Sequence, residues 1–335
     1  MTSGASSAES YPSYFLLSVS TRWNLELCIK HSLAGFPSGD NGAWTFCEIV
    51  EGDFVSFLYG ARAYNLYQVS KREALRDPEL LPPPWKPLEF GKKKIYFPFR
   101  LHLRPYRVFD EPLVRTEFAY VAENLLRRGG YSKTHFQADQ TTLQRVSEMG
   151  TVADTPPSAL DMPEHNIFTL HFGRSKSLAR PPEVLSFRET ILQSAIRRHL
   201  SSEANLQAML DQIDIHKVQP RDLEILGEKA LPEGHIDLLL KQRVPIGTAL
   251  KIPIEVKTKI VGPRDVAQLA GYMAQMEGEC PAAILIAADF GKKAMATASD
   301  NRIKLFRYAL GSDLNRAPTF EEVYRGLSLG RVVRT

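Results

Sequence analysis

The segment Leu250–Lys257 (LKIPIEVK) most narrows the structures open to this chain. Its apolar side chains alternate and therefore face one side of an extended strand, whereas Glu255 and Lys257 share the other side. In the segment His235–Leu240 (HIDLLL), alternating apolar residues again share one face, and Asp237 points the opposite way. Two strands are therefore predicted to project a carboxylate, an ammonium and a second carboxylate from an otherwise apolar background.

The surrounding pattern indicates an α/β domain with a mixed sheet, because helical and strand periodicities alternate along it. Pro263 falls near the first position of a predicted helix, where a proline is well tolerated. The predicted helices are 187–199, 202–213 and 263–276, and the predicted strands are 234–240, 252–257, 282–288 and 303–308.

The first half of the chain predicts a different, strand-rich domain with flanking helices. Strands are predicted at 14–19, 54–59, 66–69 and 95–108, and helices at 23–31 and 112–128. A stretch rich in Thr, Ser and Pro follows and shows little periodicity, which is typical of a linker, with one short strand expected at 167–172. The expected organisation is a disordered tail (1–12), a first domain (13–146), a linker (147–182), a second domain (183–312) and a C-terminal tail (313–335).

Composition sets limits on the partners and the compartment. The 335-residue chain has a formal net charge of +4 and a pI near 8.8, a mildly basic balance that fits a nucleic-acid ligand without requiring one. Cys28, Cys47 and Cys280 are dispersed, which favours reduced thiols in a cytosol and argues against a zinc site. No signal-peptide pattern is present, and the longest apolar run, 282–288, is too short to span a membrane. We therefore expect a cytoplasmic protein.

The group Asp237, Glu255 and Lys257 has the chemistry that phosphodiester hydrolysis needs. Two carboxylates can hold Mg²⁺, with Mn²⁺ as a substitute, and leave water in the remaining coordination positions. The metal neutralises phosphate charge and lowers the pKa of an attacking water. A nearby lysine can orient that water or stabilise the charge that develops in the transition state. Any one of these residues alone is more often a solvated surface charge, so the joint pattern carries the prediction.

With Gln268 and Tyr272 on the following helix, these segments resemble the PD-(D/E)XK nuclease superfamily. The similar parts are Gly234–Asp237, Ile254–Lys257, Gln268–Leu269 and the preceding stretch Glu203–Leu226, and they are most similar to the RecB-like, NucS-type branch. The resemblance implies an α/β domain with a central mixed sheet and an active site made of Glu203, Asp237, Glu255, Lys257 and Gln268. Asp237 and Glu255 would be its metal ligands.

In the first domain, the strand 95–108 is predicted to carry a basic face. Arg100 and Arg104 alternate with apolar residues, and Lys92, Lys93 and Lys94 precede them. A basic strand face of this kind suits a phosphate backbone, so these five residues are predicted DNA-backbone contacts. A solvated strand face explains the same pattern equally well.

The segment Tyr14–His31, with the strands that follow it, resembles the YTH/EVE group of PUA-like domains. These are small β-barrels that accept a flipped, modified base in an aromatic pocket, where stacking recovers part of the cost of extrusion. The resemblance implies base-edge contacts from Ser20 and Asn24 and aromatic contacts from Trp85, with Trp23, Trp44 or Phe36 as substitutes. Where the family has its first cage tryptophan, this chain has Leu33–Phe36 and no tryptophan. Core packing is the competing interpretation for each tryptophan.

Together the two halves predict a modification-dependent, type IV-like restriction endonuclease. It would recognise N6-methyladenine or a modified cytosine in DNA and cut nearby with Mg²⁺. Double-strand cleavage calls for two nuclease domains, so a homodimer is expected. A DNA-repair endonuclease for mismatched, damaged or branched DNA is one alternative, and a non-catalytic reader of modified RNA or DNA is another. The sequence leaves RNA open as a ligand.

Overall fold

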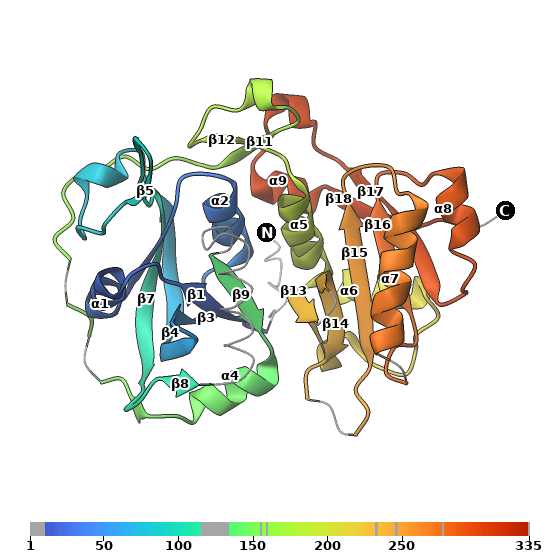
Figure 1. Ribbon diagram of the computed structural model, residues 1–335, viewed down its shortest axis with the longest axis horizontal. Helices are drawn as coiled ribbons and strands as arrows, with labels where there is room; N and C mark the ends of the chain where they lie inside the picture. The colour runs from blue at the N-terminus through green and yellow to red at the C-terminus, as the bar shows by residue number, and fades with distance from the viewer. Residues whose placement is uncertain are drawn as a thin grey trace, which may run out of the picture. The chain divides into compact units, whose positions relative to one another are not determined.

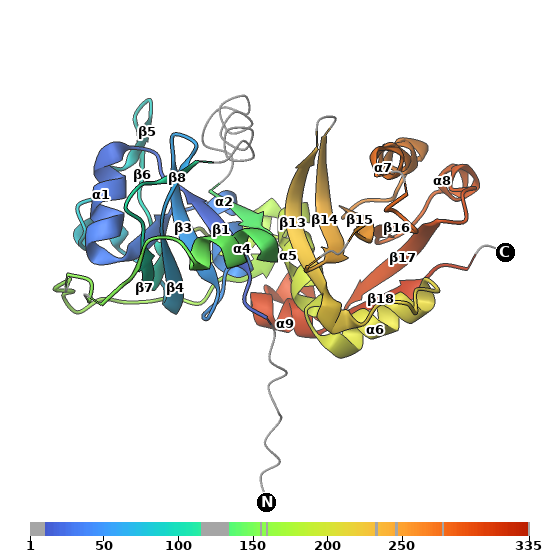
Figure 2. The same cartoon turned by 90° about the horizontal axis from the view of Figure 1, so that it is seen from below.

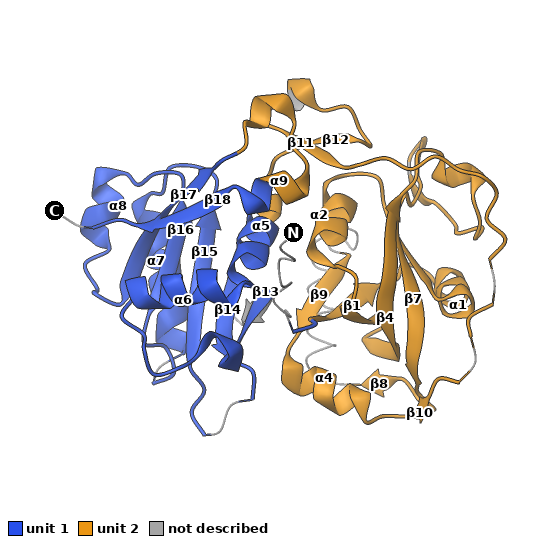
Figure 3. Ribbon diagram, turned by 180° about the vertical axis from the view of Figure 1, so that it is seen from behind, with its two compact units in different colours: residues 1–12, 192–311, 323–335 blue, residues 13–191, 312–322 orange. Residues whose placement is uncertain are grey.

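The computed structural model describes residues 11–114, 134–154, 156–158, 160–231, 234–244, 247–276 and 278–333. Internal contacts divide the chain into two units (Figure 3). Unit 2 contains Ser13–Ile191 and Ser312–Glu322, and unit 1 contains Met1–Pro12, Leu192–Gly311 and Val323–Thr335. Most of the helix predicted at 112–128 and of the tail predicted at 1–12 lies outside the described residues.

Unit 2 is built on a strongly paired sheet of eight strands with the order β10-β7-β4-β3-β1-β9, in which β2 also pairs with β7 and β8 with β4. β1 and β3 run parallel, and the other pairs are antiparallel. The strands are β1 (Tyr14–Ser18), β2 (Leu33–Phe36), β3 (Phe54–Tyr59), β4 (Arg62–Ala74), β7 (Phe99–Val108), β8 (Leu113–Val114), β9 (His135–Ala138) and β10 (Thr151–Val152).

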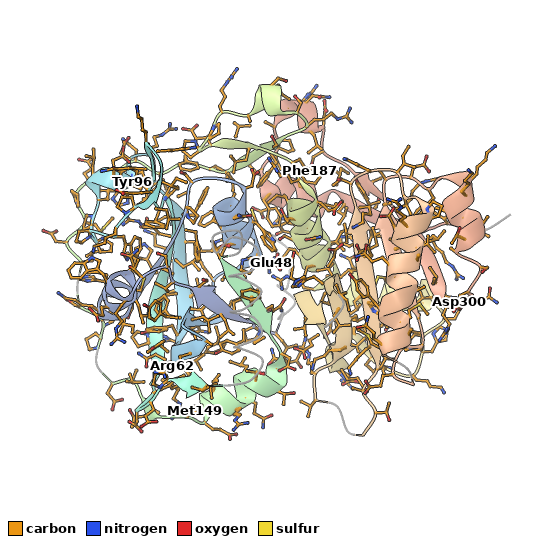
Figure 4. All side chains as sticks on the ribbon, in the orientation of Figure 1. Glu48, Arg62, Tyr96, Met149, Phe187 and Asp300 are labelled. Carbon is orange, nitrogen blue, oxygen red and sulfur yellow. The ribbon has the colours of Figure 1, made fainter. Side chains whose placement is uncertain are left out.

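Three helices and two small sheets complete the described part of unit 2. α1 is capped by the Thr21 hydroxyl, which accepts a hydrogen bond from the Asn24 N–H, and α2 ends at the buried Glu48 (Figure 4). The elements are α1 (Arg22–His31), α2 (Asp40–Glu48), α4 (Gln140–Ser147), β5 (Leu88–Phe90) paired with β6 (Lys93–Ile95), β11 (His171–Gly173) paired with β12 (Val184–Ser186), and short 3-10 turns at Pro78–Leu80, Lys176–Leu178 and Leu314–Arg316.

Unit 1 has a six-stranded mixed sheet in the order β13-β14-β15-β16-β17-β18 (Figure 1). β15, β16 and β17 run parallel, and antiparallel strands flank them. Figure 2 shows α7 and α8 on one face of this sheet and α6 on the other. The elements are α5 (Glu189–Leu200), α6 (Glu203–Gln212), a 3-10 turn (Pro220–Asp222), β13 (Leu223–Leu231), β14 (Gly234–Gln242), β15 (Lys251–Lys257), α7 (Pro263–Gln275), β16 (Ala283–Ala287), α8 (Lys292–Thr297), β17 (Ile303–Leu310), α9 (Phe320–Arg325) and β18 (Leu327–Arg331).

The mixed α and β architecture predicted from the sequence is confirmed, with two differences of detail. The described strands of unit 2 form an open order rather than the closed barrel that the YTH/EVE resemblance implied, since β9 and β10 end the order without pairing to each other. The segment 313–335, expected to be a tail, contains α9 and β18, and β18 extends the sheet of unit 1 by pairing with β17.

The segment 147–182 also differs from the linker expected there. Leu170 and Phe172 are buried in the main core of unit 2, and His171 pairs with Val184 across β11 and β12. The short strand expected at 167–172 overlaps β11, whereas the packing of Leu170 and Phe172 into the core, which removes their apolar surface from water, was not expected of a linker. Within the described residues, no helix is long and apolar enough to cross a membrane.

Candidate active site and aromatic pocket

The candidate active site of unit 1 forms where β14 and β15 part. Their backbone pairing runs from Lys241 opposite Lys251 to Leu238 opposite Ile254, and Asp237 is the next residue of β14. There the Asp237 carboxylate accepts a hydrogen bond from the Val256 N–H at 2.8 Å. A buried backbone N–H needs a hydrogen-bond acceptor. Beyond Leu238, where the backbone pairing of β14 with β15 ends, the Asp237 carboxylate supplies that acceptor. The same contact fixes the carboxylate beside Glu255.

Glu255 and Lys257 project together from β15, as the alternation predicted. Lys257 Nζ lies 2.6 Å from Glu255 Oε1 and 3.9 Å from Asp237 Oδ2. The Glu255 side chain is 1% exposed, whereas Lys257 keeps 20% of its side chain in contact with solvent. The cluster therefore consists of two largely buried carboxylates and one ammonium on the side that faces solvent. Charges held this deep interact far more strongly than charges on an open surface.

Gln268 reaches the same cluster from α7. Its Nε2 donates to Glu255 Oε1 at 3.2 Å and to the Tyr272 hydroxyl at 2.7 Å. That hydroxyl donates in turn to the backbone carbonyl of His235 at 2.9 Å, and burial raises the pKa of Tyr272. Leu269 and Met273 bury the neighbouring face of α7 in the core. The chain from Glu255 to His235 therefore ties the helix to both strands of the site.

Glu203 is the one residue of the implied active site that the structure does not bring to this cluster. It lies exposed in the first turn of α6, and its charge acts on Arg243, at the far end of β14 from Asp237. The buried residues of α6 are Leu206, Met209 and Leu210, and no local pattern says which part of the sheet they cover. Its catalytic role stays a prediction.

The two carboxylates suit magnesium better than a metal that needs a complete protein cage. Mg²⁺ is a hard cation that keeps several waters and is bound through one or two carboxylates. Among the described residues, no group of three or more His, Cys, Asp or Glu side chains is placed to hold a metal. Asp237 and Glu255 offer oxygen donors only, and Lys257 already neutralises part of their charge.

Unit 2 holds a separate aromatic pocket between β1, α1, β2 and the segment that carries Trp85. The empty space of this pocket, including the part that opens to solvent at its mouth, is about 670 Å³. Ser20, Asn24 and Trp85, three of the predicted base contacts, line it together. Its other lining residues are Leu17, Ser18, Val19, Cys28, Ala34, Gly35, Phe36, Pro37, Phe57, Leu88, Phe97 and Thr134, so no described lining side chain is charged.

The other two predicted base contacts lie elsewhere. Trp44 is buried in the core, where its ring meets His135 edge-on with the ring centroids 4.6 Å apart. Trp23 is 47% exposed, outside the lining, with Lys86 Nζ 5.9 Å from its ring centroid. Phe36, one of the substitutes named for the missing tryptophan, lies on β2 and lines the pocket. Composition alone marked the tryptophans but not which of them meet the cavity.

Gly35 is a pocket residue that the sequence did not single out. A Cβ atom at Gly35 would lie 2.2 Å from Cζ3 of Trp85, so only glycine lets the indole ring pack on β2. Phe97 meets the same ring edge-on at 5.7 Å. A glycine inside a strand often marks the close approach of another group, but no strand was predicted at Leu33–Phe36.

Asn24 is engaged with the backbone beside Trp85. Its Oδ1 accepts from the Lys86 N–H at 3.0 Å, and its Nδ2 donates to the Lys86 carbonyl at 3.3 Å. The amide therefore holds the chain segment that carries Trp85 while it forms part of the pocket wall. Nearby, burial raises the pKa of the Cys28 thiol to about 12, so this wall stays neutral.

Arg100 contradicts the predicted phosphate track. Its side chain is 1% exposed, donates to the carbonyls of Leu81 and Pro82, and places its guanidinium carbon 5.2 Å from the Trp85 ring centroid. Burial lowers the pKa of Arg100 to about 10. The alternation of the strand was read correctly, but the segment from Leu81 to Trp85 covers the face that was expected to meet solvent. Arg104, further along β7, is exposed and donates to Gln68 Oε1 at 2.6 Å.

Lys92, Lys93 and Lys94 remain exposed at the turn and second strand of the β5–β6 hairpin. Lys94 Nζ lies 3.9 Å from Glu89 on the paired strand. Unlike the buried Arg100, these three lysines are therefore exposed to solvent. Their contact with a nucleic-acid backbone stays a prediction.

A row of three residues runs across the sheet beneath Trp85. Gly35 on β2 and Glu73 on β4 both pair with Arg100 on β7, so their side-chain positions share one face. Burial of Glu73 opposes its ionisation, but hydrogen bonds from Lys71 at 2.9 Å and His102 at 2.5 Å outweigh it and lower the pKa of Glu73 to about 2. Gly35 leaves room for the Trp85 ring, and Arg100 holds the segment that carries Trp85 through its hydrogen bonds to Leu81 and Pro82.

No known protein-family model matches the sequence, and no curated protein matches it. Three solved structures show low similarity. A repair endonuclease from Pyrococcus abyssi is 14% identical with a TM-score of 0.23, over 31% of this chain and 45% of that one, so the chain spans less than half of its length. The DNA modification-dependent restriction endonuclease AspBHI is 14% identical with a TM-score of 0.21, over 89% and 75% of the two chains.

The third structure is the MspJI restriction endonuclease in complex with a 27-mer oligonucleotide. It is 11% identical with a TM-score of 0.20, over 83% of this chain and 68% of that one. With all three TM-scores below 0.5, the roles of the two sites in this chain rest on their own geometry.

Proposed function

We propose that this protein is a modification-dependent restriction endonuclease that hydrolyses DNA with Mg²⁺. The observation that carries the proposal is the sunken cluster of Asp237, Glu255 and Lys257, at the point where two strands part. An ammonium held within 4 Å of two carboxylates suits hydrolysis of an anionic diester better than a structural role, because burying several charges is unfavourable for folding.

In the proposed reaction, Asp237 and Glu255 hold the metal through their oxygens. Bound Mg²⁺ would supply charge neutralisation at the phosphate and a lower pKa for the attacking water. Lys257 keeps one-fifth of its side chain exposed and would orient that water or stabilise the developing charge on phosphate oxygen. Gln268 donates to Glu255 and fixes the direction of its carboxylate, a positioning task rather than a chemical one.

The aromatic pocket of unit 2 supports a reader for a flipped, modified base. Its described lining is neutral and contains Phe36, Phe57, Trp85 and Phe97, which favours a flat uncharged heterocycle over a phosphate. N6-methyladenine or a modified cytosine has that character. Tethering the two units in one chain would raise the effective concentration of the nuclease beside a bound base. A homodimer would supply the second cluster that double-strand cleavage requires.

The test is cleavage by the full chain with Mg²⁺ on four matched duplexes: unmodified, N6-methylated on adenine, methylated on cytosine, and mismatched. We expect cutting of one modified duplex above the others. Lys257→Ala should abolish it, whereas Lys251→Ala, at the other end of β15 and paired with Glu279, should not. Equal cutting of all four duplexes would overturn the restriction function, and preferred cutting of the mismatched duplex would instead favour repair. Cutting by the Lys257 variant would overturn the active-site assignment.

A further inference from the structure

Trp23 is exposed in a way that its place in the fold does not explain. The other two tryptophans, Trp44 and Trp85, are buried, whereas almost half of Trp23 meets solvent. Keeping a large aromatic side chain in water is unfavourable, and exposed aromatic surface often marks a binding site. Lys86 lies over the ring at 5.9 Å from its centroid, so the two residues form one aromatic and cationic surface, the Trp23–Lys86 pair.

This pair lies at the rim of the aromatic pocket. Trp23 directly precedes the pocket residue Asn24, and Lys86 directly follows the pocket residue Trp85. The two hydrogen bonds between the Asn24 amide and the Lys86 backbone join the segments at this point. Ser20, the exposed member of the pocket lining, lies three residues before Trp23 and marks the open side.

The surroundings of the pair are basic. The β5–β6 hairpin begins two residues after Lys86, and it carries Leu88 into the pocket lining while Lys92 and Lys93 stay exposed. The two acids of α1 and of this hairpin are already paired, Glu26 with Arg22 at 2.9 Å and Glu89 with Lys94 at 3.9 Å. In the described part of the chain, no acidic side chain lies within ion-pair distance of Lys86, Lys92 or Lys93.

We propose that the Trp23–Lys86 pair is a second subsite, which binds the polynucleotide strand next to the base held in the pocket. The inference rests on the proposed function, since it takes the occupant of the pocket to be a base. Trp23 stacks on the neighbouring base of the strand, and Lys86, Lys92 and Lys93 bind the flanking phosphates. Aromatic stacking with lysines along the backbone is the usual chemistry of strand binding. The ligand is therefore a base within a strand rather than a free nucleoside.

A double-mutant cycle on DNA tests this directly. The probes are fluorescent 12-mer duplexes with one N6-methyladenine or one 5-methylcytosine, each with an intact neighbouring base or with an abasic neighbour on either side. Binding is measured by fluorescence polarisation without Mg²⁺. Stacking on one base is worth roughly 1–3 kcal/mol, so we expect Trp23→Ala to weaken binding about 5- to 150-fold. The abasic neighbour should weaken wild-type binding by a similar factor but add little to the Trp23 variant.

Three controls separate the possible failures. Tyr106→Ala removes another half-exposed aromatic of unit 2 and should leave binding unchanged. Trp85→Ala should remove the preference for the modified base, and Lys86→Ala should reduce the slope of log affinity against log salt by about 1. Unchanged binding of the Trp23 variant, or fully additive losses in the cycle, would overturn the second subsite while leaving the reader intact. A wild-type protein without preference for either modified base would overturn the reader and, with it, the subsite.

Discussion

The acidic cluster of unit 1 and the aromatic pocket of unit 2 place charge in opposite ways. In unit 1, the Lys257 ammonium lies within 4 Å of the carboxylates of both Glu255 and Asp237, at the site itself. In unit 2, the charges of Arg100 and Glu73 lie behind Trp85, and the described lining of the pocket is neutral. The difference indicates that the charged side chains take part in the reaction in unit 1, whereas in unit 2 they hold the segment around Trp85 in place. Variants that neutralise a charge should therefore remove activity in unit 1 but stability in unit 2.

The largest expected effect is on cleavage by Glu255→Gln. The variant keeps the size of the side chain but loses a proposed metal ligand, so we expect the cleavage rate to fall by about 10²–10³-fold. Thermal stability should stay the same or rise, because a crowded carboxylate pair is relieved. Glu279→Gln is the matched control, since Glu279 pairs with Lys251 of the same strand. Equal rates for the two variants would place the chemistry elsewhere.

The second effect concerns the stability of unit 2 at low pH, which depends on the buried carboxylate of Glu73. The pKa of Glu73 is lowered to about 2 from an ordinary value of 4.5, so its stabilising contribution is fully present above pH 4.5 and is lost as the pH falls towards 2. This difference corresponds to at most about 3 kcal/mol. Lys71, His102, His165 and Arg100 all face this carboxylate.

Urea unfolding of the full chain at pH 7, 5, 4 and 3 measures this contribution. Wild type should lose more stability between pH 5 and pH 3 than Glu73→Gln, which lacks the titrating group. Glu89→Gln, on the exposed hairpin, should follow wild type. Identical pH profiles for wild type and Glu73→Gln would show that Glu73 is not ionised in the folded protein.

The third effect contrasts two arginines of the same strand. Arg100→Met removes two hydrogen bonds to the carbonyls of Leu81 and Pro82 and the contact with Trp85, so we expect a loss of about 2 kcal/mol in the free energy of unfolding. Arg104→Met should change it by less than about 0.5 kcal/mol, because Arg104 is exposed. Denaturant unfolding followed by tryptophan fluorescence reports both the stability and the environment of Trp85. Equal effects would mean that Arg100 does not anchor this segment.

The smallest effect is expected from Tyr272→Phe. Removing the hydroxyl breaks the link from Gln268 to the His235 carbonyl without disturbing the buried ring. We expect the cleavage rate to fall about 10-fold, equivalent to about 1 kcal/mol, with little change in DNA affinity. Tyr106→Phe in unit 2 is the control. A loss of affinity with an unchanged rate would instead assign Tyr272 to DNA binding.

The sequence predicted the heart of the acidic cluster because it depends on local geometry. The period of a strand places Glu255 and Lys257 on one face whatever surrounds them. The order of the segments then brought Asp237 and Gln268 within range, since β14, β15 and α7 follow one another along the chain and pack together. Glu203 does not join the cluster, because no local pattern specifies which part of the sheet α6 covers.

The pocket could be predicted only in part, because its residues meet through distant pairings. Ser20, Asn24 and Trp85 were predicted correctly to lie together, but Trp44 is buried in the core, Trp23 lies outside the lining and Arg100 is covered. A tryptophan or an arginine on an alternating strand has the same local pattern whether or not another segment covers it.

By itself, the sequence determined the two strands of the acidic cluster, their faces and the residue types able to do chemistry, because these follow from backbone period and side-chain identity. The tertiary structure alone decided that β14 and β15 part at Asp237, so that a carboxylate replaces a backbone acceptor. It also decided that Gly35, Arg100 and Glu73 align beneath Trp85. The physical reason is burial, because segments far away in the chain decide which charged side chain is solvated and which is enclosed. That difference decides whether the side chain can take part in a reaction or only stabilises the fold.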